Sequence, residues 1–383
     1  MDTLLRALTR QQPEMLAMLG RFVECESPST DKAAVDRFGK MLAAILREAG
    51  ARVSTIRSPS TGDHLRAEFR FASVAKARQI LVLGHMDTVW ELGTISRMPF
   101  RVQRGRAYGP GTFDMKSGIV IAIFAVQNLL RLGIPLKKNV TLLLNADEEI
   151  GSPASRPITE REVRRSECAL VVEPPHGVNG ALKTARKGVG EFLLTVHGRA
   201  AHAGIEPEKG ASAITELAKQ LISLESVAKN IRGVTVSAGT IRGGTRSNVI
   251  PAEAVAHIDV RVLRAADQRK LEKHFRSLHP IDRRTALSVT GGFNRPPMER
   301  TRQVAALFER ARRLAKSLGL DLKETAVGGG SDGNFTAALG VPTLDGLGAL
   351  GDGAHATHEH VVIRELPRRA ALLAHLIASL ASD

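Results

Sequence analysis

The chain has 383 residues, of which 43% are apolar and 24% are charged. This length and composition are typical of a globular protein with two or three domains, and they exclude a disordered chain. The longest continuous apolar run covers residues 119–126, far fewer than the roughly 18–20 residues of a transmembrane helix. We therefore expect a soluble protein without a membrane partner.

The net charge is strongly positive, because 54 Lys and Arg residues outnumber 39 Asp and Glu residues and give a formal charge of +15. The basic residues are scattered along the chain, and one Trp and one Tyr offer little aromatic surface for stacking bases. We therefore expect no nucleic-acid partner. A positive field would instead attract small acidic substrates.

The N-terminus and the cysteines indicate the cellular compartment. The first residues contain no basic segment followed by an apolar stretch and a cleavage site, so we predict no secretory signal and a cytoplasmic protein. The two cysteines, Cys25 and Cys168, lie in apolar segments. This placement favours buried thiols over a disulfide scaffold or a Cys-rich zinc finger.

The first part of the chain predicts helices that alternate with buried strands. In chain order these are helices 2–24 and 32–49, strands 52–56, 65–71 and 79–83, helix 117–132, and strands 140–144 and 168–172. Runs such as residues 80–83 are continuously apolar, which is typical of strands covered by helices on both faces. The sequence therefore predicts an α/β domain with a mostly parallel sheet and helices on both faces.

The middle of the chain has a different order of elements. It predicts strand 190–196, helix 211–229, strands 233–241 and 254–263, helix 267–278 and strand 286–290. This β-α-β-β-α-β order is that of a ferredoxin-like α+β domain. A helix at 302–318, a strand at 341–347 and a helix at 367–380 then resume the first domain. We predict a discontinuous domain of residues 1–183 and 295–383 with an inserted domain of residues 184–294.

Acidic and imidazole side chains follow three of the predicted strands. His85 and Asp87 follow the first, Glu148 and Glu149 the second, and Glu173 the third. Ligands of open parallel sheets bind at the carboxyl ends of the strands, so these groups should converge. Asp114 in a glycine-rich turn and the late His355 complete the set.

So many carboxylates would repel one another without cations, whereas one or two divalent ions make the cluster favourable. Nitrogen and oxygen ligands without thiolate suit Zn²⁺, with Co²⁺ or Mn²⁺ as substitutes. Two ions bridged by a carboxylate would lower the pKa of bound water toward about 7. The ligand set therefore predicts an amide hydrolase.

Each signal has a purely structural interpretation when it is taken alone. A strand-end Asp often caps the next helix, and acidic residues after a strand suit a helix N-terminus. Glu173 precedes two prolines and could be an exposed turn residue, and a loop histidine is usually solvated. The glycine-rich segments 328–333 and 111–117 lack the context of a dinucleotide or phosphate loop. The combination of the acidic and imidazole groups, in this order, favours the metal site.

These residues resemble the co-catalytic zinc family of aminoacylases, deacylases and carboxypeptidases, and most closely the bacterial glutamate carboxypeptidases of the carboxypeptidase G type. The resemblance covers nearly the whole chain and rests on matching stretches. They are Gly84–Val89, Pro99–Val102, Tyr108–Gly111, Asp114–Gly118, Asp147–Ser152, Glu173–Pro174, Gly198–Gly204, Ser247–Pro251 and Gly328–Gly333. The resemblance implies a zinc-exopeptidase-like catalytic domain with an inserted lid and dimerisation domain, and hence a homodimer formed through the lid.

The resemblance also implies roles for the residues of the catalytic domain. The implied ligands are His85 and Glu173 for one zinc, Glu149 and His355 for the other, and Asp114 as the bridge between them. Asp87 would orient His85, and Glu148 would be the general base. The peptide bond after Asp114 would be cis. The stretch after His355 differs from the carboxypeptidase G pattern by about one residue, so His358 is an alternative ligand.

In the lid, the resemblance implies that His202 reaches the partner subunit's active site and stabilises the oxyanion. Asn248 and Arg295 would hold the substrate carboxylate, and the backbone around Gly330 and Ser331 would line the same pocket. Arg295 precedes two prolines, so an ordinary interdomain turn is the alternative interpretation.

Together these features predict a two-zinc metallopeptidase that releases a C-terminal amino acid. We expect this to be glutamate from an N-acyl or folate-like conjugate. The alternatives are an N-acyl amino acid deacylase with the same metal chemistry, a non-catalytic ligand-binding relative, and a basic nucleic-acid-binding protein.

Overall fold

The computed structural model describes residues 2–71 and 78–382, which form two compact units. Unit 1 comprises residues 1–185, 300–327 and 331–383, and unit 2 comprises residues 186–299 and 328–330. The predicted boundaries lie at residues 183/184 and 294/295. Each unit has its own buried apolar core, which is what an independent domain requires.

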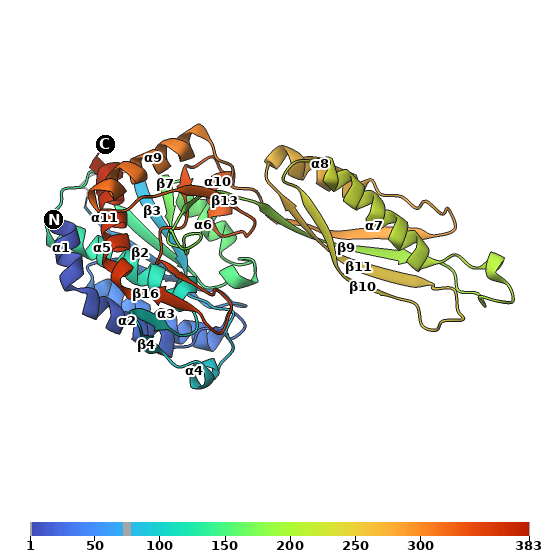
Figure 1. The fold of residues 1–383 in the computed structure, drawn as a ribbon, viewed down its shortest axis with the longest axis horizontal. Helices are drawn as coiled ribbons and strands as arrows, with labels where there is room; N and C mark the ends of the chain where they lie inside the picture. Colours follow the sequence, from blue (N-terminus) through green and yellow to red (C-terminus); the bar gives the residue numbers. More distant parts are fainter. Residues whose placement is uncertain (1, 72–77, 383) are drawn as a thin grey trace. The chain divides into compact units, whose positions relative to one another are not determined.

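Unit 1 is built from helices around a central sheet (Figure 1). Its helices are α1 (Thr3–Arg10), α2 (Gln12–Glu24), α3 (Lys32–Glu48), α4 (Thr94–Arg97), α5 (Ser117–Arg131), α6 (Arg156–Val163), α9 (Arg302–Ser317), α10 (Gly333–Ala338) and α11 (Leu366–Ser382). The six strands of the central sheet are β1 (Arg52–Ile56), β2 (His64–Phe69), β6 (Val140–Asn145), β3 (Gln79–His85), β7 (Ser166–Val171) and β14 (Thr343–Leu344), in that spatial order.

The sheet is largely parallel, as the sequence predicts. Strands β6, β3, β7 and β14 pair in parallel, whereas β1–β2 and β2–β6 pair antiparallel. Alternate residues of β3 enter different cores: Ile80 and Val82 pack with α5 and α11, and Leu81 and Leu83 pack with α6. Because side chains alternate along a strand, this division shows that helices cover both faces.

Several predicted elements differ from the structure, and the predicted strand 286–290 extends to Ala286–Arg295. The predicted helix 2–24 is two helices, because Pro13 at the start of α2 lacks an N–H and clashes with the preceding helical turn. The predicted strand 341–347 shrinks to Thr343–Leu344. Short strands in two small sheets were not predicted: β4 (Arg101–Gln103), β5 (Arg106–Tyr108), β15 (Gly351–Asp352) and β16 (His360–Val362), and β8 (Leu182–Arg186) paired with β13 (Glu324–Val327).

Unit 2 has the predicted ferredoxin-like order of elements. These are β9 (Gly188–His197), α7 (Ala213–Lys229), β10 (Thr235–Gly243), β11 (Glu253–Val262), α8 (Ala265–Arg276) and β12 (Ala286–Arg295). All neighbouring strands pair antiparallel in the order β10-β11-β9-β12. In this order β10 and β12 are the edge strands. The buried side chains of the sheet pack on α7 and α8.

One helical stretch among the described residues is long and apolar enough to cross a membrane. It covers Thr112–Arg131, and 83% of its most apolar window is buried inside the protein. Most of this stretch is α5, which Figure 1 shows in unit 1. The burial is that of a core helix.

Candidate metal centre

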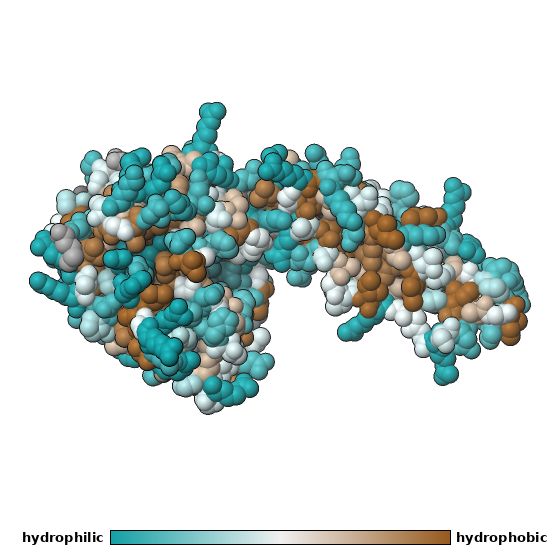
Figure 2. Space-filling view, viewed as in Figure 1, coloured by the Kyte–Doolittle hydropathy of each residue, from teal (hydrophilic) through white to brown (hydrophobic). Residues whose placement is uncertain are grey.

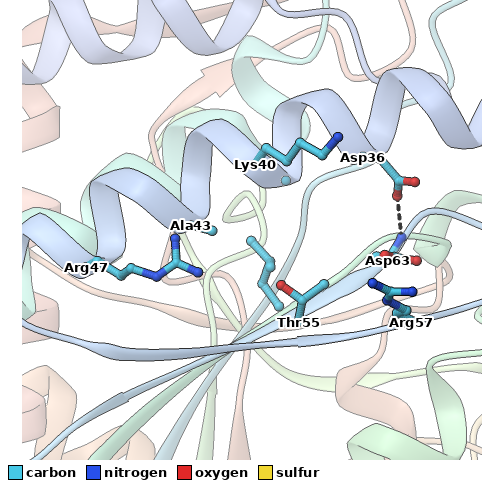
Figure 3. Close-up of a pocket in the computed structure, with 9 residues that line it drawn as sticks. Asp36, Lys40, Ala43, Arg47, Thr55, Arg57 and Asp63 are labelled. Atoms are coloured by element: carbon cyan, nitrogen blue, oxygen red, sulfur yellow. Dashed lines mark hydrogen bonds between the residues drawn. The ribbon is translucent and has the colours of Figure 1, made fainter.

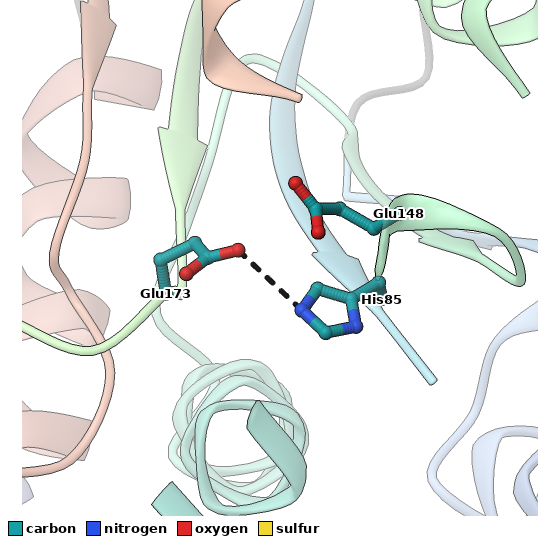
Figure 4. A group of neighbouring side chains, drawn as sticks. All are labelled: His85, Glu148 and Glu173. Carbon is teal, nitrogen blue, oxygen red and sulfur yellow. Dashed lines mark ion pairs between the residues drawn. The ribbon is translucent and has the colours of Figure 1, made fainter. Parts of the chain in front are cut away.

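Three neighbouring strands of unit 1 end beside one another and carry the predicted side chains. His85 is the last residue of β3, Glu148 and Glu149 lie in a helical turn after β6, and Glu173 follows β7. Because β3 pairs in parallel with both β6 and β7, these ends meet at one edge of the sheet. Figure 4 shows His85, Glu148 and Glu173 pointing toward one another.

The two histidines of the site lie on either side of Asp114. His85 Nε2 is 3.3 Å from Asp114 Oδ1 and 3.5 Å from Glu173 Oε1. His355 Nε2 is 3.5 Å from Asp114 Oδ2 and 3.3 Å from Glu149 Oε2. Each oxygen of Asp114 therefore faces a different imidazole. The structure thus brings together all five predicted ligands, in two groups that share one carboxylate.

The donor atoms of this cluster fit a metal centre. His85 Nε2, Asp114 Oδ1 and Glu149 Oε1 are buried, and within the described residues they have no hydrogen-bond partner. Buried polar atoms without a partner are unfavourable, and a divalent cation would satisfy them. Ligand atoms of His85, Asp114 and Glu149 lie within 4.8 Å of one another, as do those of His85, Glu148 and Glu173. Imidazole nitrogens with carboxylate oxygens suit Zn²⁺.

The electrostatics of the cluster are strongly perturbed. Burial alone would lower the pKa of His85, but the neighbouring carboxylates of Asp114, Asp87 and Glu173 raise it well above its usual value. Ion pairing with Asp114 and Glu149 raises the pKa of His355 to about 10. Burial raises the pKa of Glu149. The carboxylates thus favour the protonated, positively charged form of both imidazoles. A bound divalent cation would supply this positive charge in place of the protons.

Asp87 supports both the histidine and the glutamate pair. His85 Nδ1 lies 3.0 Å from the Asp87 backbone oxygen and 3.4 Å from its Oδ1. The same carboxylate accepts the backbone N–H groups of Glu148 and Glu149, at 3.2 and 3.1 Å, and the Ser29 hydroxyl at 2.7 Å. The sequence analysis predicted that Asp87 orients His85. Its hydrogen bonds to the glutamate backbone were not predicted.

His355 and not His358 lies in the cluster. Among the described residues, His358 forms no ion pair with the acidic groups, and His360 packs against Tyr108 at 5.1 Å between ring centroids. The backbone of His355 has φ of +61°, a left-handed conformation that is uncommon outside glycine and recurs at functional sites. The Asp114–Met115 peptide bond is cis, as the resemblance implied.

The predicted substrate-binding residues lie mainly in unit 2. His202 is exposed and forms a β-bridge with Val249, so it lies beside Asn248. Arg295 is the last residue of β12 and is buried rather than exposed in a turn. It packs so closely on Gly330 that a Cβ there would lie 2.6 Å from the Arg295 Cδ.

Ser331, a predicted substrate-binding residue of unit 1, is fully buried. Its hydroxyl donates to Asp345 and its backbone N–H donates to Asn334. Both donors of Ser331 therefore serve the local fold.

The sequence analysis did not predict that Lys116 anchors the segment after Asp114 to α2. This buried side chain donates from Nζ to the backbone oxygens of Phe22 and Cys25, both at 2.9 Å, and lies 4.7 Å from the Phe38 ring. It therefore ties the residues after Asp114 to the C-terminal end of α2. A lysine separated by only two residues from the apolar run 119–126 is the sequence signal that would have found it.

A cavity of about 370 Å³ lies elsewhere in unit 1, between α3 and the β1–β2 hairpin (Figure 3). Its walls include Lys40, Arg47 and Arg57, together with Asp36 and Asp63. Lys32 pairs with both of these aspartates. This cavity contains no histidine or glutamate, so the cluster around Asp114 is the candidate metal centre.

A carboxylate and imidazole cluster at the carboxyl ends of a parallel sheet, joined to a separate ferredoxin-like unit, defines the chain as a metallohydrolase of the two-domain peptidase type. A family model described as Peptidase family M20/M25/M40 matches residues 81–379, and the chain therefore belongs to that family.

Individual relatives differ in their activities. The chain is 30% identical to carboxypeptidase G2 from Pseudomonas sp. (strain RS-16), over 99% of this chain and 92% of that protein. It is 27% identical to acetylornithine deacetylase from Erwinia tasmaniensis, over 75% and 78% of the two chains. Its fold matches a dinuclear metal-binding M20 peptidase of Bacillus subtilis, with a TM-score of 0.73, 16% identity and coverage of 98% and 99%.

Proposed function

We propose that the chain is a two-zinc hydrolase that cleaves an amide bond and releases a C-terminal glutamate from an N-acyl or folate-like conjugate. The observation that carries this proposal is the shared carboxylate of Asp114, which faces His85 through one oxygen and His355 through the other. The similarity to carboxypeptidase G2 over 99% of the chain supports glutamate as the released amino acid.

In this proposal His85 and Glu173 would hold one zinc, Glu149 and His355 would hold the other, and Asp114 would be shared by both. Bound ions would polarise the amide carbonyl and make water more nucleophilic near neutral pH. Glu148 takes a proton from the attacking water and passes it to the departing amine. The Asp87 hydrogen bond to the Glu148 N–H supports this role, because it fixes the backbone from which the base projects.

We assign the remaining roles to the residues that the resemblance implies. Asn248 and Arg295 hold the carboxylates of the substrate, with Arg295 at the side-chain carboxylate of glutamate and the backbone at Gly330 and Ser331 alongside. His202 donates to the oxyanion in the partner subunit. A homodimer through unit 2 is supported by its exposed apolar residues, namely Ile205, Ile214, Ile222, Ile241 and Ile281. Figure 2 shows apolar surface on this part of the molecule.

The first experiment measures metal per chain and then product release in the same preparation. The substrates are folate, N-acetylglutamate and an N-acylated neutral amino acid, each tested before and after chelation. Two zinc ions with chelator-sensitive release of glutamate alone would support the proposal. A chain that binds no metal after zinc is added back would refute it.

A second candidate function is an N-acyl amino acid deacylase, which the similarity to acetylornithine deacetylase favours. Arg295→Ala separates the two, because a guanidinium that pairs with the second carboxylate of glutamate lowers KM for acidic substrates only. We expect the variant to raise KM for acidic substrates and to leave KM for neutral ones unchanged. Equal KM changes for both classes would remove Arg295 from substrate selection.

A further inference from the structure

Glu359 is a buried carboxylate that accepts four N–H donors. Its side chain is completely inaccessible to solvent. Oε1 accepts the backbone N–H groups of Phe113 and Asp114, at 2.8 and 3.0 Å. Oε2 accepts the backbone N–H of Gly111 at 2.9 Å and the indole N–H of Trp90 at 2.7 Å. Both oxygens are therefore saturated by donors from this chain.

These donors come from the segments that carry the metal-binding side chains. Gly111, Phe113 and Asp114 form the turn that precedes α5 and holds the bridging carboxylate. Trp90 lies in the loop after β3, the strand that ends at His85. Glu359 itself is four residues beyond His355. One carboxylate thus joins three segments that are far apart in the sequence.

The hydrogen bonds also explain how the turn keeps its shape. Gly111 and Phe113 are buried, and buried N–H groups without an acceptor are unfavourable. Gly111 has φ of +70°, a conformation that favours glycine and here turns its N–H toward the carboxylate. A carboxylate held by several N–H groups is a strong, charge-assisted anchor. Asp114 therefore projects from a backbone fixed by Glu359.

We infer that Glu359 is a positioning residue that sets the geometry of the bridging Asp114 and couples it to the segments of His85 and His355. This inference rests on the proposed metal centre. It adds a determinant of metal affinity that touches neither metal nor substrate. Supporting groups of this kind typically change metal affinity by about 10- to 100-fold when they are removed.

Glu359→Gln tests the inference with almost no change in side-chain volume. An amide has one oxygen and one NH₂ group. In either orientation, the NH₂ faces two N–H donors, either those of Phe113 and Asp114 or those of Gly111 and Trp90. The variant therefore replaces two hydrogen bonds by donor–donor contacts. Glu365→Gln is the matched control, because Glu365 is also buried but pairs with Arg364 and Arg368.

The experiment titrates the metal-free full chain with Zn²⁺ in competition with a chromophoric chelator. Trp90 is the single tryptophan, so its emission follows the Glu359 contact in the same titration. We expect Glu359→Gln to raise the Kd for zinc by about 10- to 100-fold, and Glu365→Gln to leave it unchanged. Zinc at saturating concentration should restore much of kcat.

The outcomes separate this inference from the proposed function. A wild-type chain that binds no zinc would refute the proposed metal centre itself. A wild-type chain that binds two zinc ions, with the same Kd in Glu359→Gln, would overturn the inference alone. A lower Tm with an unchanged Kd would assign Glu359 a purely structural role. If Glu359→Gln does not fold, Trp90→Phe removes one donor only, and an unchanged Kd in that variant also overturns the inference.

Discussion

Replacing Gly118 by alanine should separate two ligand-bearing elements of the metal centre. A Cβ on Gly118, at the start of α5, would lie 2.0 Å from the backbone oxygen of Val172 and 3.0 Å from Met115 Cε. A carbon cannot approach a carbonyl oxygen much more closely than about 3 Å. The start of α5 and the end of β7 must therefore move apart by about 1 Å. Asp114 precedes Gly118 by four residues, and Glu173 follows Val172 directly.

The expected effect on function follows from that displacement. Metal sites tolerate ligand distances within about 0.2 Å, and a misplacement of about 1 Å can lower a rate by about 100-fold. We expect Gly118→Ala to lower kcat/KM at least about 100-fold and to weaken zinc binding. Overpacking should also lower the free energy of unfolding by about 1–3 kcal/mol. Steady-state kinetics, chelator competition and urea unfolding measure the three effects.

Gly39→Ala provides the matched control. A Cβ on this residue of α3 would meet Met86 Sδ at 3.6 Å and the Asp63 oxygen at 4.0 Å, which are ordinary contacts. Removing a glycine from a helix interior should raise the free energy of unfolding by about 0.5–1 kcal/mol and leave kcat/KM unchanged. Wild-type kinetics and zinc affinity in Gly118→Ala would refute the argument that the packing of α5 on β7 sets the ligand geometry.

Three further predictions concern single charged groups. Glu148→Gln should lower kcat by about 10²- to 10⁴-fold with both zinc ions retained in elemental analysis, and loss of a metal would make Glu148 a ligand. Lys116→Met should lower the free energy of urea unfolding by about 3 kcal/mol, because two carbonyls lose a charged donor; an unchanged value would refute this anchoring. Burial raises the pKa of Glu216, but hydrogen bonds from Gln220 and the N–H groups of residues 281 and 282 lower it overall. The ionised Glu216 therefore stabilises the fold above the pKa that it has in the unfolded chain, and this stabilisation is lost as the pH falls through its lower pKa in the folded chain. The thermal stability of Glu216→Gln should accordingly depend less on pH between about 3 and 5 than that of the wild type.

The strands that carry the site could be predicted because their signals are local. Continuous apolar runs mark β3, β6 and β7, and the acidic residues follow directly in the sequence. The parallel arrangement then brings their ends together without further information. The break between α1 and α2 was missed although Pro13 marks it, because the apolar spacing continues across the break.

The supporting contacts could not be predicted because they join distant segments. Glu359 lies 245 to 269 residues from its donors, and its hydrogen bonds leave no periodic pattern in the sequence. The adjacent strand β16 has three residues, too few for a hydrophobic period to be detected. The sequence alone therefore indicates which residues can bind a metal. The backbone contacts that orient these residues can be identified only in the folded structure.

The proposed pair of ions fits the charges that surround Asp114 in unit 1. Asp87 and Glu359 are satisfied by backbone and side-chain donors of the chain itself. The carboxylates of Asp114, Glu149 and Glu173 pair with the two imidazoles in the contacts described above. Imidazoles that bind metals must be neutral, so their compensating charge disappears when ions enter. A single divalent ion would offset two of the three carboxylate charges, so we propose that a second ion on the His355 side offsets the third.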